Sequence, residues 1–133
     1  MGKQVTTGQV KIDTDAYVKE HSAEAVTTST EYIVVPGLSV TPVAAKYDVK
    51  LSGSLEVSKN NATVFTSIFF DGAQILSSER KFKRGGSQAN IHGSFFCHTI
   101  IETDGTQAIE GQWKTSAGST ATMHARSLVI VRV

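Results

Sequence analysis

The sequence predicts one antiparallel β-sandwich, and its composition, its alternation and the spacing of its turns each support that fold class. The chain has 133 residues, which fits one domain and leaves little room for two. Thr, Val and Ile occur 15, 14 and 9 times, whereas Leu occurs 5 times. Because β-branched side chains suit a pleated sheet better than a helix, this composition excludes a helical bundle or coiled coil. About seven or eight short strands with turn residues between them are typical of a sandwich.

The N-terminal region differs from the rest. Residues 1–22 hold only scattered apolar side chains among charged ones, so we expect an extended N-terminal arm or a weak edge strand outside the core. The predicted sandwich domain covers residues 23–133. Its first strand is expected at Ala25 to Val35 and is closed by Pro36-Gly37, a typical turn pair.

The clearest strand is predicted from Lys46 to Ser58. Alternate residues from Tyr47 to Val57 are apolar except Gly53, and the residues between them are polar, which is the pattern of a half-buried strand. Gly53 in the middle indicates a bulge or a bend.

A hairpin is predicted between Thr63 and Ser78. Asp71-Gly72 lies between two apolar runs, and these residue types tolerate the positive φ angles of a type I′ turn. Val64 to Phe70 is apolar on both faces, so this strand is either central or meets another subunit. Further strands are expected at residues 89–101, 107–114 and 120–133, with turn-rich segments between them.

Charge and cysteine content exclude several classes. The net charge is +1, which argues against a nucleic-acid partner, although residues 80–84 form one basic cluster. Cys97 is the single cysteine, so no intramolecular disulfide can form, and a reducing compartment is expected. We expect no secretory signal at the N-terminus and no membrane partner, because no apolar stretch approaches the roughly 20 residues of a membrane helix.

Four segments carry a resemblance to a known family. They are Tyr32 to Leu38, Tyr47 to Ser54, Phe69-Phe70-Asp71-Gly72-Ala73-Gln74-Ile75, and the ending His124 to Val133. Over residues 24–133 the chain resembles jelly-roll domains of the tumour-necrosis-factor and complement-globular type, and more specifically phage structural proteins with that fold.

The resemblance implies a homotrimeric jelly-roll β-sandwich with a structural role. The expected function is that of a phage capsid decoration protein, made in the host cytoplasm and located on the virion surface, with the major capsid protein as partner. A receptor- or carbohydrate-binding module of a tail tip or fibre is the alternative. No enzyme activity and no cofactor are expected.

Apolar side chains on both faces of several strands favour a trimer on physical grounds, because a two-layer sandwich has only one interior. Trp113 is expected in the core, with a subunit interface as the alternative. The predicted trimer-interface residues are Phe69, Phe95, Trp113, Leu128 and Ile130. The predicted capsid-contact residues lie in the N-terminal arm and the basic cluster: Val5, Val10, Ile12, Arg80, Lys81, Lys83 and Arg84.

Metal and nucleophile signals are weak in the sequence. His92 and His98 stand six residues apart, about 20 Å along a strand, so they cannot share one ion. We therefore expect surface or interface histidines, except where a symmetry axis would bring copies of one histidine together. Asp13 and Asp15 lack the loop of a calcium site. Cys97 is predicted to be a buried, inert thiol.

Overall fold

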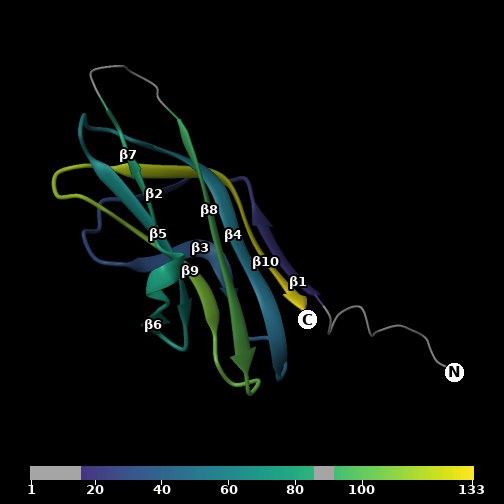
Figure 1. Ribbon diagram of the computed structural model, residues 1–133. Helices are drawn as coiled ribbons and strands as arrows, with labels where there is room; N and C mark the ends of the chain where they lie inside the picture. The colour runs from purple at the N-terminus through teal and green to yellow at the C-terminus, as the bar shows by residue number, and fades with distance from the viewer. Residues whose placement is uncertain (1–15, 86–91) are drawn as a thin grey trace, which may run out of the picture.

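The computed structural model describes residues 16–85 and 92–133 as two antiparallel sheets packed face to face in a jelly-roll-like sandwich (Figure 1). The predicted fold class is confirmed. The elements are β1 (Ala16–His21), β2 (Ala25–Thr27), β3 (Ile33–Val40), β4 (Ala45–Val57), β5 (Thr63–Phe70), β6 (Ala73–Gln74), the 3₁₀ turn η1 (Leu76–Ser78), β7 (Arg80–Lys83), β8 (Gly93–Thr103), β9 (Ile109–Thr115) and β10 (Ala121–Arg132). No helix among these residues is long and apolar enough to cross a membrane.

Each sheet combines strands that are distant in the sequence. The first sheet has the order β1-β10-β4-β8, with β2 also paired to β10. The second sheet has the order β3-β9-β5-β6, with β7 also paired to β5. Ala16 pairs with Val131, so the start of the described chain lies beside its C-terminal end (Figure 1). Residues 16–21, placed in the predicted arm, form the edge strand that was the alternative expectation for this region.

The interior contains the side chains that alternation predicted for β4. Tyr47, Val49, Leu51 and Leu55 are fully buried, and Val57 is nearly so. They face the second sheet, where Trp113, Ile109, Ile68 and Val64 are also buried, so one continuous core fills the space between the sheets. Gly111 lets the sheets approach closely, since a Cβ there would lie 2.6 Å from Leu51 Cδ1. The β4 prediction is therefore confirmed.

A bulge in β10 lies opposite Gly53, where the sequence indicated an irregularity. Met123 pairs with Leu55 but Arg126 pairs with Gly53, so β10 carries one extra residue at this point. The extra residue reverses the alternation: Met123 is buried before the bulge, and Leu128 and Ile130 are buried after it. This explains why the C-terminal strand has apolar residues on both parities.

The predicted single strand from Ala25 to Val35 is wrong. The chain instead leaves the first sheet after β2 and enters the second sheet at β3. Pro36-Gly37 does not close a strand, because it lies within β3 at a register shift against β9. Gly37 adopts φ +84°, and the His21 ring occupies the space that a Cβ would need.

The Asp71-Gly72 hairpin is confirmed. Phe70 pairs with Ala73, and both turn residues have positive φ, 53° and 81°. Its second strand is only the two residues of β6, after which η1 leads into β7. Strand β7 contains the first four residues of the basic cluster.

Candidate functional site

The five predicted trimer-interface side chains are not exposed. Trp113, Leu128 and Ile130 have no exposed area, and Phe69 and Phe95 are each 9% exposed. A side chain needs accessible surface to bury against a second copy, so this assignment of interface residues is corrected. Four of the five belong to the core between the sheets, and Phe69 lies on the outer face of the second sheet.

Phe69 is covered by its own chain. The Tyr32 ring lies 5.1 Å from the Phe69 ring, and Tyr32 donates a 2.6 Å hydrogen bond from its hydroxyl to Glu79 Oε2. Burial, together with this bond, raises the pKa of the Tyr32 phenol far above its usual range, and the same bond lowers the pKa of Glu79. Gln74 also donates to Glu79, so the polar rim around Phe69 is held together.

The neighbouring Phe65 is covered in a similar way. Lys81 and Lys114 place their ammonium groups 5.7 and 5.0 Å from the centre of the Phe65 ring. Lys114 also lies 4.8 Å from the centre of the Tyr32 ring. Lysine stems and cation–π contacts thus cover the aromatic outer face of the second sheet.

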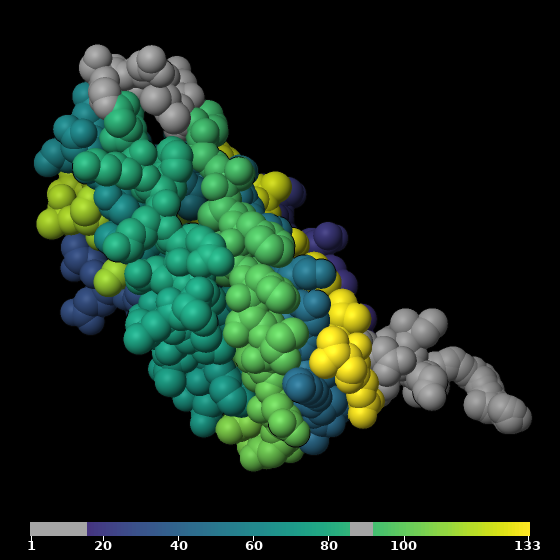
Figure 2. Space-filling view, in the orientation of Figure 1, coloured from purple at the N-terminus to yellow at the C-terminus, as the bar shows by residue number. Residues whose placement is uncertain are grey.

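The outer face of the first sheet keeps its apolar side chains exposed. On β8, Phe96 and Ile100 are 52% and 47% exposed, and we call them the β8 strip. On β1 and β10, Val18 and Val131 are 55% and 42% exposed, and with the half-buried Val129, which pairs with Val18, they form the valine strip. In Figure 2, β8 runs along the surface between the second sheet and the end of β10.

A polar column on β4 separates the two strips. Asp48 pairs in register with Val131 on one side and Ile100 on the other, and Lys50 stands between Val129 and His98. His98 Nε2 lies 2.7 Å from Asp48 Oδ1, and the His98 ring stacks on Phe96 at 6.4 Å. This face therefore carries two exposed apolar strips with a charged column between them.

The four predicted capsid-contact residues of the basic cluster lie on or next to β7 and make different contacts. Arg80 donates to the carbonyl oxygens of Ser77 and Glu79, and Lys81 lies over Phe65. Arg84 donates to the carbonyl oxygen of Val57, and Lys83 is exposed at the end of β7. The remaining predicted contacts, Val5, Val10 and Ile12, and also Asp13 and Asp15, lie outside the described residues.

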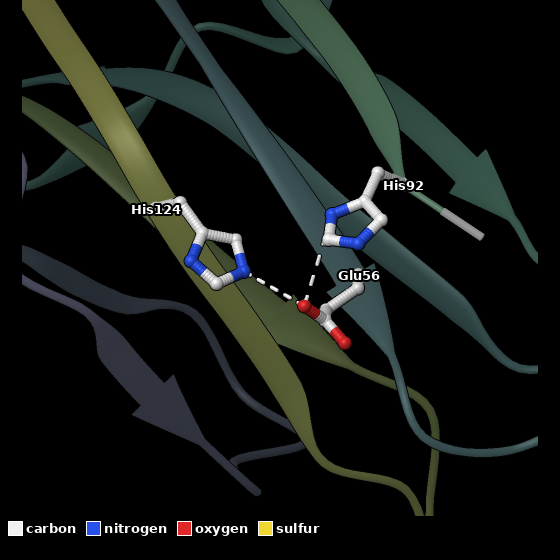
Figure 3. Close-up of side chains that lie close together, drawn as sticks. All are labelled: Glu56, His92 and His124. Carbon is white, nitrogen blue, oxygen red and sulfur yellow. Dashed lines mark hydrogen bonds and ion pairs between the residues drawn. The ribbon is translucent and has the colours of Figure 1, made fainter. Parts of the chain in front are cut away.

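A cluster that sequence reasoning missed lies at one end of the first sheet. Glu56, His92 and His124 each place a ligand atom within 4.8 Å of the other two (Figure 3). His124 Nε2 lies 2.7 Å from Glu56 Oε2, and His92 Nδ1 lies 3.8 Å from the same oxygen. His124 Nδ1 lies 4.0 Å from Glu24 Oε2. His92 and His124 are 32 residues apart in the chain, and no spacing motif connects them.

Two buried groups are structural. Cys97 is fully buried, as predicted; burial raises the pKa of its thiol, which disfavours the reactive thiolate.

Arg126 is 6% exposed and donates hydrogen bonds to the carbonyl oxygens of Pro36, Ala23 and His124. Burial lowers the pKa of its guanidinium, and these bonds connect the β10 bulge to β3 of the second sheet.

No family model matches this chain, and no curated protein matches it. Solved structures with the same fold do match. The structure of infectious bursal disease virus Gt strain aligns with a TM-score of 0.57 at 12% identity, over 88% of this chain and 33% of that chain. The infectious bursal disease virus VP2 subviral particle aligns with a TM-score of 0.55 at 12% identity, over 88% and 32%.

A second kind of protein has the same fold along nearly its whole length. Eiger TNF from S. frugiperda aligns with a TM-score of 0.56 at 8% identity, over 90% of this chain and 93% of that chain. The present chain spans about a third of the viral chains. At these identities the comparisons show the fold alone: the chain is similar to the jelly-roll domains of virus particles and of TNF.

Proposed function

We propose that this protein is a structural component of a phage particle, a decoration protein that binds the outer surface of the capsid as a homotrimer. The observation that carries the proposal is the exposed apolar surface on the outer face of the first sheet, formed by the β8 strip and the valine strip. Similarity to chains of virus particles over 88% of the sequence supports the structural role.

The two strips favour association between copies. They lie on opposite sides of the β4 column, and we propose that the β8 strip of one copy packs against the valine strip of the next. A contact between two different patches is heterologous, and it forms a closed ring when the rotation between copies returns to the start. We propose a ring of three, the state implied by the resemblance to trimeric jelly-roll proteins.

A trimer of this kind would act through binding energy. Three linked contacts with the major capsid protein gain from high effective concentration, so each single contact can be weak. Because the trimer would bind only the assembled shell, it would stabilise that state by mass action. The contact residues we propose are the exposed Lys83 of β7, its neighbours Arg80 and Lys81, and the N-terminal Val5, Val10 and Ile12.

Light scattering on the purified full chain tests the trimer. The protein should have about three times the 14.2 kDa mass of one chain. The double variant Phe96→Ser, Ile100→Ser should have the mass of a monomer and remain folded, because the substitutions remove the apolar side chains of the β8 strip. Leu76→Ser is the matched control, since Leu76 is 77% exposed on η1 and belongs to neither strip, and the variant should stay trimeric. A monomeric wild-type chain would refute the proposed assembly.

Binding to the particle tests the decoration role. The chain should co-sediment with capsids assembled without it, and purified virions should contain hundreds of copies. A few copies per virion would instead support the alternative, a tail-tip or fibre module that binds a receptor or a carbohydrate. Failure to co-sediment by a trimeric wild-type chain would contradict the decoration role and leave the trimer intact.

A further inference from the structure

The cluster of Glu56, His92 and His124 is formed by three separate segments of the chain. Glu56 is on β4, His124 is on β10 and His92 directly precedes β8, so the cluster joins neighbouring strands of the first sheet. Figure 3 shows the two imidazole rings on either side of the Glu56 carboxylate. Among residues 16–85 and 92–133, this is the only place where three such ligand atoms meet.

We propose that Glu56, His92 and His124 form a zinc-binding site on the surface of the first sheet. Two imidazole nitrogens and one carboxylate oxygen are a donor set that zinc uses, whereas calcium and magnesium prefer oxygen donors only. Three protein ligands leave the fourth position of a tetrahedral ion open to water. This site is independent of the proposed capsid role.

The distances suit a small adjustment around one ion. Bonds of about 2.0–2.1 Å in a tetrahedral site place two ligand atoms about 3.3 Å apart. Here the Glu56 oxygen lies 2.7 Å from His124 Nε2 and 3.8 Å from His92 Nδ1. These two distances must change by about half an ångström, and the two histidine nitrogens, which lie within 4.8 Å of each other, must approach by up to about 1.5 Å, which rotation of exposed side chains can supply. The side chains are 33% to 55% exposed, so an ion can reach them from solvent.

The fold places His124 on the outer side of the sheet, where its ring faces Glu56. The β10 bulge lies directly after Met123, and it leaves both His124 and Ala125 on the outer side of the sheet. Glu24 Oε2 lies 4.0 Å from His124 Nδ1, on the side of the ring opposite the cluster. A carboxylate that accepts from the second ring nitrogen orients the imidazole and strengthens it as a ligand. At 4.0 Å this contact is too long for a hydrogen bond, so we infer that the 61% exposed Glu24 side chain moves onto Nδ1 when an ion binds and then acts as a positioning residue.

The same sheet provides a matched control. His98 and Asp48 form a histidine–carboxylate pair at 2.7 Å, the same distance as between His124 and Glu56. No third ligand from the described residues joins that pair. Substituting His98 therefore removes an equivalent exposed imidazole without touching the proposed site.

Zinc titration of the tag-free full chain tests the proposal. Calorimetry should give one zinc per chain, and cobalt as a probe should give the visible absorption of a four-coordinate ion. His92→Asn, His124→Asn and Glu56→Gln should each weaken zinc binding at least about tenfold, and Glu24→Gln about tenfold. His98→Gln should bind as the wild type does. Zinc should also raise the Tm of the wild type and not that of the triple variant His92→Asn, His124→Asn, Glu56→Gln.

Two results would overturn the proposal: no saturable zinc binding by the wild-type chain, or binding by the triple variant equal to that of the wild type. Circular dichroism of each variant without zinc should match the wild type, so that loss of binding is not loss of fold. All three ligands lie on the outer surface, where substitutions leave the core intact.

Discussion

The outer faces of the two sheets treat apolar side chains in opposite ways. On the second sheet, Phe65 and Phe69 lie beneath Tyr32, Lys81 and Lys114 of the same chain. On the first sheet, the strip residues Phe96, Ile100, Val18 and Val131 remain 42% to 55% exposed, although the His98 ring stacks on Phe96. The outer aromatic side chains of β5 are therefore covered within the protomer, whereas the two strips of the first sheet stay exposed. On β3 of the second sheet, Ile33 and Val34 are also 42% and 37% exposed.

The difference shows why apolar surface on a strand does not by itself predict an interface. Val64 to Phe70 is apolar on both faces, yet its outer aromatics are covered within the protomer. The exposed apolar surface lies instead on β8, where Phe96 and Ile100 alternate with the buried Phe95, Cys97 and Ile101. Location within the sheet, rather than apolar content, decides which apolar surface stays exposed.

The largest expected effect comes from removing the cover on the second sheet. Tyr32→Ala should lower the free energy of unfolding by about 2 kcal/mol, because it exposes Phe69 and leaves Glu79 without its phenol donor. Urea denaturation followed by tryptophan fluorescence measures this change, and the oligomeric state should not change. A loss as small as that of an exposed residue would show that the cover is not stabilising.

A smaller effect is expected from the hydroxyl alone. Tyr32→Phe should cost about 1 kcal/mol at pH 7. The bond lowers the pKa of Glu79 below its ordinary 4.5. The contribution of this bond to the free energy of unfolding is therefore complete above pH 4.5 and is lost as the pH falls through the pKa of Glu79 in the folded state. Urea curves at pH 7 and pH 3 should show the difference between wild type and variant shrinking at pH 3. A constant difference would mean that the Glu79 charge plays no part.

The smallest effect on stability should come from the first sheet. Phe96→Ala should change the free energy of unfolding of the isolated protomer by no more than about 0.5 kcal/mol, because the side chain is 52% exposed. At low protein concentration, the Phe96→Ala variant should have the same free energy of unfolding as the wild type. At high concentration, its assembly into oligomers should be weaker. A large loss at low concentration would mean that Phe96 stabilises its own protomer, contrary to the comparison.

Much of the fold was predictable because local rules governed it. Alternation identified β4, and Asp71-Gly72 identified the hairpin, since each depends on residues near one another in the sequence. The split between β2 and β3 was not predictable from Pro36-Gly37, because the pair occupies a bulge whose backbone depends on β9 and on the His21 ring. The β10 bulge similarly hid the parity change from Met123 to Leu128.

The candidate site was less predictable than the fold. Phe69 on the second sheet and Phe96 on the first are both phenylalanines in apolar strands, so the sequence does not distinguish them. In the structure Phe69 is covered by the Tyr32 ring, whereas Phe96 is 52% exposed. His92 and His98 share one predicted strand, whereas the partners of His92 in the cluster, Glu56 and His124, come from β4 and β10. The weak signal that existed was the irregularity at Gly53, which locates the bulge next to His124.

The hydrogen bonds of Arg126 do not depend on which side chains its partner residues carry. Its three acceptors are the backbone carbonyl oxygens of residues 23, 36 and 124. No particular side chain at those positions is therefore needed to accept its hydrogen bonds. Relatives could therefore replace all three residues and keep the link, provided the chain follows the same path. A search for distant relatives of this protein should look for an arginine after a bulge in the last strand, without an acidic residue that co-varies with it.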